Sequence, residues 1–154
     1  MSPPQNVAEQ FAVLQTLYNW AAGIDLKDTA LLASTYAPNA ISDFGPAAAK
    51  AGLEYPILEG RDAIVGALTG SLASFDTTHS VSNPRVTVSG DARAAHVEAM
   101  VEAQHVMKSD GERFYMMKNR YDAKFVKVDG VWLIEHIVVD NVWRSGDAAV
   151  LAGV

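Results

Sequence analysis

The sequence lacks several features that would indicate particular classes of protein. It contains no cysteine, which excludes disulfides, thiolate metal sites and a cysteine nucleophile. No apolar run approaches the roughly 20 residues that a membrane-spanning helix needs. The first residues, MSPPQNVAEQ, lack the basic and apolar regions of a signal peptide. These absences predict a cytoplasmic protein without a membrane partner.

Positive charge is also scarce. Twelve lysines and arginines stand against 18 acidic residues, which gives a net charge of −6. Without a basic cluster the chain is not expected to bind nucleic acid. The 154 residues are 49% hydrophobic and 19% charged, as in ordinary globular proteins. This length fits one domain over residues 1–154, with a core over about 7–144 and a C-terminal tail over 145–154.

The first part of the chain carries helical periodicity. The spacing predicts a helix over roughly residues 5 to 24. Apolar residues at steps of four and three define its expected core-facing stripe: Val7, Phe11, Leu14, Tyr18 and Ala21. The next step of four reaches Asp25, and an ionised carboxylate on that face needs a partner if it is buried.

Shorter elements are expected next. Asp28 is a typical N-cap for a second helix that continues through Tyr36 and ends before Pro38. Residues 40–45 suit a short strand. Residues 46–56 contain two prolines and a glycine, which favours a loop or flap. Beyond this segment, a further helix is predicted from about Gly60, with a helical period that extends to Phe75.

After Phe75 the pattern changes to that of strands. Turn residues separate four long β segments, at 79–88, 92–108, 112–127 and 131–144. Helices followed by hairpin-linked strands predict an α+β fold. Pro84 has no backbone donor, which favours an edge or bulged position for the first of these strands.

Strand alternation sorts the side chains by face. One face carries small apolar groups with a few isolated polar ones, and such a surface on a curved sheet is typical of a small-molecule pocket. The residues expected to bind substrate there are His105, Asn119, Tyr121, Trp20, Phe44, Met117, Val101, Ile137 and Asn141. The last strand is apolar on both faces, which predicts a second buried surface and a homodimer or homotrimer.

The order of these elements, ending in the hairpin RYDAKFVKVDGVWLIEHI, resembles the NTF2-like superfamily. More narrowly it resembles the SnoaL-like branch, over about residues 7 to 144. The resemblance implies a cone-shaped (cystatin-like) fold, in which a strongly curved mixed sheet surrounds a cavity that helices close. It implies the fold more strongly than the activity, because this scaffold hosts many chemistries.

Scytalone dehydratase and lindane dehydrochlorinase, two enzymes of that superfamily, use an aspartate–histidine pair in the cavity. The segments AAGID and TTHSVSN here resemble those that supply the pair, which assigns the catalytic roles to Asp25 and His79. The second cavity histidine of the dehydratase corresponds to His105.

Around this pair the chain departs from both enzymes. Ile24 and Phe44 occupy the neighbourhoods of the dehydratase's two tyrosines, and the dehydrochlorinase's lysine and arginine are replaced by Trp20 and Ile137. The resemblance therefore implies a related acid–base reaction on a different and more apolar substrate.

A carboxylate that accepts the Nδ1–H of an imidazole fixes its tautomer and leaves Nε2 free as a base. With His79 as base and Asp25 as its partner, dehydration, β-elimination or isomerisation is expected, with no cofactor and no metal. Two alternatives stay open: a polyketide-cyclase-like enzyme, and a non-catalytic ligand-binding or assembly module. A hydrolase ranks lower, because alternation offers only Glu135 and Asp43 as a second inward carboxylate.

Overall fold

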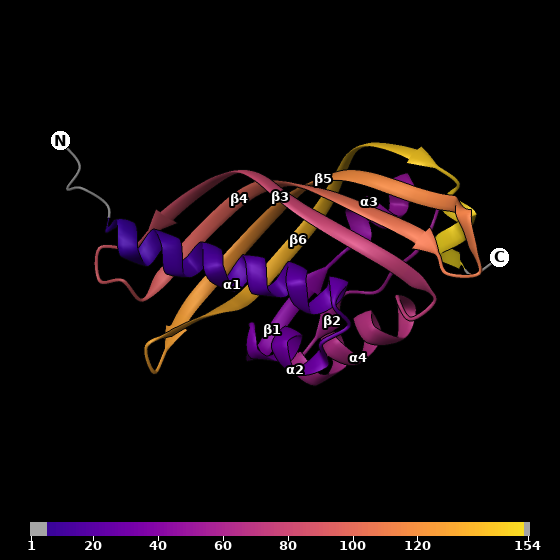
Figure 1. Ribbon diagram of the computed structural model, residues 1–154. Coiled ribbons are helices and arrows are strands. Elements are labelled where there is room, and N and C mark those ends of the chain that lie inside the picture. Colours follow the sequence, from indigo (N-terminus) through magenta and orange to yellow (C-terminus); the bar gives the residue numbers. More distant parts are fainter. Residues whose placement is uncertain (1–5, 153–154) are drawn as a thin grey trace.

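Residues 6–152, which the computed structural model describes, form an α+β fold (Figure 1). In chain order the elements are α1 (Val7–Asp25), α2 (Thr29–Ser34), β1 (Tyr36–Asp43), α3 (Gly45–Lys50), β2 (Leu58–Glu59), α4 (Arg61–Ser71), β3 (Phe75–Val88), β4 (Ala94–Met107), β5 (Asp110–Val128), β6 (Val131–Gly146) and the 3₁₀-helix η1 (Ala148–Ala152). No helix within this part of the chain is long and apolar enough to cross a membrane.

The strands form a single mixed sheet in the order β2–β1–β6–β5–β4–β3. Only β1 and β6 are paired in parallel, and every other pair is antiparallel. Figure 1 shows α1 crossing the long strands at an angle, where it contacts β3 and β6, with α2 and α4 gathered beside β1 and β2. The predicted α+β class and the four long strands are confirmed.

β3 lies at one edge of the sheet, where it pairs only with β4. This pairing is interrupted between Ser82 and Arg85, and Asn83 has a φ of +52°. Pro84 lies inside the interruption, where its missing N–H removes no ladder hydrogen bond. The predicted edge or bulged position of this proline is therefore confirmed.

The stripe predicted for the first helix is wrong at three of its five positions. Val7 and Phe11 are 74% and 63% exposed, and Tyr18 is 37% exposed. Ala21 is buried as predicted, and a second set of apolar residues in the same helix faces the core with it: Val13, Leu17, Trp20 and Ile24. A helix this rich in apolar residues carries two competing stripes, and the sheet that it meets decides between them. Residue 5, its predicted start, lies outside the described residues.

Two short elements also differ from their prediction. Asp28 caps α2 by accepting a hydrogen bond from the backbone N–H of Leu31, but the helix ends at Ser34. Tyr36 and Pro38 already belong to β1, because burial of the tyrosine ring in the core outweighs the helical period. The first residues of the expected loop form α3, with Pro46 in its first turn, where a missing N–H does no harm.

A bulge in β6 changes the meaning of its apolar pattern. Glu135 has no partner on β5, since the register shifts between Ile134 and His136. The extra residue reverses the alternation, so the buried side chains before and after it face the same interior: Trp132, Ile134, Ile137 and Val139. The apolar pattern of this strand is therefore explained within one chain and is no evidence of a second buried surface, whereas the homodimer or homotrimer stays a prediction.

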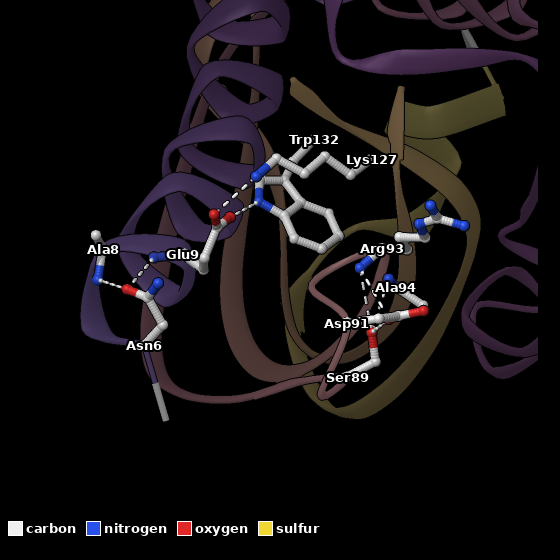
Figure 2. A network of polar contacts seen from close by, with 9 residues as sticks. All are labelled: Asn6, Ala8, Glu9, Ser89, Asp91, Arg93, Ala94, Lys127 and Trp132. Atoms are coloured by element: carbon white, nitrogen blue, oxygen red, sulfur yellow. Dashed lines mark hydrogen bonds and ion pairs between the residues drawn. The ribbon is translucent and has the colours of Figure 1, made fainter. Parts of the chain in front are cut away.

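The N-terminal end of α1 is tied to the β5–β6 hairpin (Figure 2). Glu9 accepts hydrogen bonds of 2.7 Å from both Lys127 Nζ and Trp132 Nε1. These two bonds, that of Lys127 first, hold the pKa of the Glu9 carboxyl below its usual range. One turn earlier, Asn6 caps the helix through the backbone N–H of Ala8. The polar contacts fix the start of α1 against the sheet.

The C-terminal segment expected as a tail folds back onto the sheet as η1. Val150 is fully buried and packs in a small cluster with Phe75 and Tyr115. The turn into this segment passes through Gly146, whose φ is +96°. Residues 153–154 of the expected tail lie outside the described residues.

Candidate active site

A cavity of about 310 Å³ lies between the interior face of the sheet, the C-terminal half of α1, α3 and the segment after it, the end of α4, and η1. This volume is at the lower end of the range for small-molecule sites. Its wall is mostly apolar, with single polar groups from separate strands. Seven of the predicted site residues line it: His79, His105, Asn119, Tyr121, Trp20, Phe44 and Met117.

Asp25 and His79 form a hydrogen-bonded pair at this cavity. Asp25 is the last residue of α1, and its side chain lies behind His79, which projects from β3. Nδ1 of His79 is 2.7 Å from Oδ1 of Asp25. Oδ2 of Asp25 accepts the backbone N–H of His79 at 2.7 Å. Thr77 donates its hydroxyl to Oδ1 at 3.0 Å, so three donors hold the carboxylate.

These contacts keep Asp25 ionised. Burial raises the pKa of this carboxyl, but the hydrogen bonds and charge of His79, together with the Thr77 hydroxyl, outweigh burial and hold the pKa below its ordinary value. An ionised carboxylate can only accept at the Nδ1 position, so His79 carries its proton on Nδ1. The carboxylate therefore sets the tautomer of the ring.

The other ring nitrogen of His79 faces the cavity. Among the described residues, Nε2 has no hydrogen-bond partner. The fully buried side-chain polar atoms without a partner there are Tyr115 OH and Asn141 Oδ1, and Nε2 is not one of them. Nε2 is therefore not sealed under other side chains. The imidazole itself is only 5% exposed, so its basic nitrogen is reached from the cavity rather than from bulk water.

His105 is a second imidazole at the same site. Its ring centroid is 6.0 Å from that of His79, in an edge-on arrangement. Nδ1 lies 3.2 Å from the backbone carbonyl oxygen of Tyr115, to which it can only donate. Burial, followed by the charge of His79, lowers the pKa of His105 to about 4. At neutral pH this ring is therefore uncharged and offers Nε2 as an acceptor.

Aromatic rings form the wall beside the pair. The Trp20 ring packs edge-on against His79 and Tyr121, and its Nε1 donates to the hydroxyl of Tyr36 at 2.6 Å. Burial raises the pKa of Tyr36 to about 12 and also raises the pKa of Tyr121. The hydroxyl of Tyr121 has no hydrogen-bond partner among residues 6–152, and it is not among the fully buried atoms there that lack one. It therefore faces the cavity as a neutral donor.

Three residues expected to bind substrate do not line the cavity. Val101 and Ile137 are fully buried and pack in the core. Asn141 is 2% exposed and donates to Asn119, which stands between it and the cavity. Alternation predicts which face of the sheet a side chain is on. It does not predict whether that position along the strand lies at the cavity or in the packed core, which explains these errors.

The sequence also missed part of the wall. The segment predicted as a loop or flap contributes Leu53, Glu54 and Tyr55, and the Tyr55 ring packs edge-on against Phe44. η1 contributes Leu151 and Ala152. Neither segment has a strand or helix periodicity that would predict which side chains face the cavity. The apolar residues on either side of Glu54 could have indicated that this segment is partly buried.

The two carboxylates that strand alternation offered lie outside this arrangement. Neither Glu135 nor Asp43 lines the cavity: Glu135 is the exposed bulge residue, and Asp43 accepts the backbone N–H of Gly45. Across the described part of the chain, no three His, Asp or Glu side chains are grouped so that they could hold a metal ion. The site is a mainly apolar cavity with an ordered carboxylate–imidazole pair.

The chain belongs to the SnoaL-like family, since the model of the SnoaL-like domain matches residues 5–138. It is 27% identical over 150 residues to "Terrestric acid biosynthesis cluster protein E" of Penicillium crustosum, across 94% of this chain and 90% of that protein. The family resemblance inferred from the sequence is thereby confirmed.

Solved structures share the fold. A putative scytalone dehydratase from Novosphingobium aromaticivorans superposes with a TM-score of 0.78 at 21% identity, over 92% of this chain and 89% of that one. A hexachlorocyclohexane dehydrochlorinase superposes with a TM-score of 0.76 at 16% identity, over 91% and 89%. The fold is the predicted NTF2-like, or cystatin-like, cone.

Proposed function

We propose that this protein is a cofactor-free acid–base enzyme that acts on a small, largely apolar organic molecule. The observation that carries the proposal is the 2.7 Å contact between Asp25 and His79, with Nε2 of the imidazole open to the cavity. The proteins that this chain resembles include a biosynthesis cluster protein, a putative dehydratase and a dehydrochlorinase, and their names support small-molecule chemistry of this kind.

His79 acts as the base in the proposed reaction. Nε2 removes a proton from a carbon next to a carbonyl or next to a leaving group, and Asp25 stabilises the imidazolium that forms. The same imidazolium then returns the proton, either to a departing hydroxyl or to another carbon. The first course is a dehydration or β-elimination, and the second is an isomerisation. The neutral hydroxyl of Tyr121 and the amide of Asn119 are placed to bind a substrate oxygen.

The apolar wall favours one further candidate. An aldol-type cyclisation, as in a polyketide cyclase, starts with the same proton removal and needs a cavity that folds the substrate. Three aromatic side chains line this cavity and offer rings against which a flat carbon skeleton can pack: Trp20, Tyr121 and Phe44.

Two small ketones test the proposal. β-Hydroxycyclohexanone loses water, and β,γ-unsaturated cyclohexenone isomerises, to the same conjugated enone, whose ultraviolet absorbance reports both reactions. We expect the wild type to form this enone from at least one probe, and His79→Gln to be slower by about 10²-fold or more. Equal rates for both proteins, together with equal α-proton exchange in D₂O, would contradict the proposal and favour a ligand-binding module.

We also propose that copies of the chain associate through the outer face of β6. Val142 and Trp143 are 46% and 51% exposed there, next to each other. Sedimentation velocity at micromolar concentration is expected to show a dimer or trimer of the 16.5 kDa chain. Trp143→Ser should shift the distribution toward the monomer, with Val128→Ser on the hairpin as control. A wild-type monomer would contradict this expectation.

A further inference from the structure

The pairing of β5 with β6 shifts a second time, beside the cavity. Asn119 pairs with Asn141 and Lys118 pairs with Trp143, so Val142 is an extra residue on β6. At this bulge the Nδ2 of Asn141 donates to two backbone carbonyls, that of Trp143 at 3.0 Å and that of Lys118 at 3.4 Å. The Asn141 side-chain amide is thus fixed by two backbone carbonyls at the bulge.

These two carbonyls fix which way the Asn141 amide points. A carbonyl oxygen accepts but never donates, so the amide atom that faces both must be the NH₂ group. The reversed orientation would place Oδ1 against two other oxygens. The same Nδ2 also lies 2.9 Å from Oδ1 of Asn119, so its two hydrogens are shared among three acceptors. The orientation of Asn141 therefore determines that of Asn119.

Asn119 is left with its NH₂ group on the cavity side. Its Oδ1 is occupied by Asn141, and its side chain is among those that line the cavity. Over residues 6–152 its Nδ2 has no hydrogen-bond partner. It is also not among the fully buried polar atoms without a partner, so it is accessible from the cavity. The cavity is therefore offered an N–H donor at this position, not a carbonyl acceptor.

We propose that Asn141 is a positioning residue that makes Asn119 a hydrogen-bond donor, and that the site consequently selects carbonyl compounds. The inference rests on the proposed function, because it names the substrate class for the same cavity. When Nε2 of His79 takes the proton next to the carbonyl, the C–H electron pair forms a C=C bond and the C=O π pair moves onto the oxygen, which gives an enolate. A fixed N–H donor at that oxygen stabilises the developing charge more than the ground state.

A matched pair of bicyclic probes measures this selection. α-Tetralone and tetralin share one carbon skeleton, and only the ketone has an oxygen that Asn119 can donate to. Binding of each is followed by chemical shifts of the ¹⁵N-labelled protein, including the side-chain NH₂ of Asn119. We expect the wild type to bind the ketone about fivefold more tightly, as one hydrogen bond would give. Only the ketone should shift the Asn119 NH₂ signal.

Asn141→Asp tests the positioning role. The introduced carboxylate has nearly the same shape but accepts where the amide donated, so the Asn119 amide should turn its NH₂ away from the cavity. The preference for the ketone should then disappear, while tetralin affinity stays within about twofold. Asn39→Asp makes the same chemical change at an exposed position of β1 and should keep the preference. A purely structural effect would weaken both probes equally and would overturn the proposal.

Asn119→Ala keeps the inference testable if the first variant does not fold. It removes the donor and leaves the bonds from Asn141 to the two carbonyls in place. Retention of the ketone preference in this variant, or its absence from the wild type, would overturn the inference. The role of His79 as a base is tested separately. If His79 is not the base, the ketone shows no enzyme-dependent α-proton exchange, but the ratio of the two affinities is unchanged.

Discussion

Asp25→Asn is expected to lower turnover by roughly 10²–10⁴-fold while leaving the protein folded. The asparagine has almost the shape of the aspartate, but it carries no charge to stabilise an imidazolium. It can also turn its NH₂ toward Nδ1 of His79, which would move the ring proton to Nε2, the nitrogen that the proposed reaction needs unprotonated. Initial rates on the cyclohexanone probes measure the first effect.

¹⁵N chemical shifts of the imidazole measure the second effect without any substrate. The wild type should show the proton on Nδ1 of His79, and the asparagine variant should show loss of that tautomer. Asp62→Asn, an exposed residue of α4, makes the same change and should alter neither rate nor tautomer. An unchanged tautomer in Asp25→Asn would remove the main support for His79 as a base.

The Asp25 contact also predicts a difference in acid stability between the two proteins. Because the pKa of Asp25 is lower when folded, its contribution to stability is complete above the ordinary carboxyl value of 3.8. The contribution is lost as the pH falls through the lower value of the folded protein. Asp25→Asn has no such group, so its stability should fall less steeply in this acid range.

Gly146→Ala is expected to destabilise the protein by about 2–4 kcal/mol. A methyl group there would clash with the carbonyl oxygen of Phe114, and the φ of +96° disfavours any side chain. Urea denaturation measures the loss. Hydrogen exchange over residues 147–152 should show that η1 has detached, which removes Leu151 from the cavity wall.

Gly130→Ala separates the two causes. Gly130 also has a positive φ, +80°, but a methyl group there would meet nothing within 4 Å. This variant should lose only about 1–2 kcal/mol, the cost of the left-handed backbone. Equal losses at Gly130 and Gly146 would contradict the predicted clash with Phe114.

The sequence predicts the strands well because their signals are local. Asp129 and Gly130 have φ values of +49° and +80°, as a tight hairpin turn requires, and alternation on either side continues into long strands. The proximity of Asp25 and His79 came from the family resemblance, since a pair 54 positions apart in the sequence carries no local signal. The catalytic role of the pair stays a prediction.

What the sequence missed depends on neighbours that a single segment does not reveal. The bulge at Glu135 exists only relative to β5, so the apolar faces of β6 look like two surfaces until the partner strand is known. Val7 and Phe11 suit a core as well as Val13 and Leu17 do, and only the position of the sheet separates them. The orientation of the Asn119 amide follows from a third residue across the strand pair.

The contact between Oδ2 of Asp25 and the backbone of His79 has a consequence for solubility. β3 is the last strand of the sheet, and its outward N–H groups could pair with a strand of another molecule. At His79 that donor is already occupied by the aspartate. The carboxylate assigned to catalysis thus also occupies one backbone donor with which an aggregating strand would pair. A chain that loses this carboxylate offers neighbouring molecules a free backbone donor at the sheet edge.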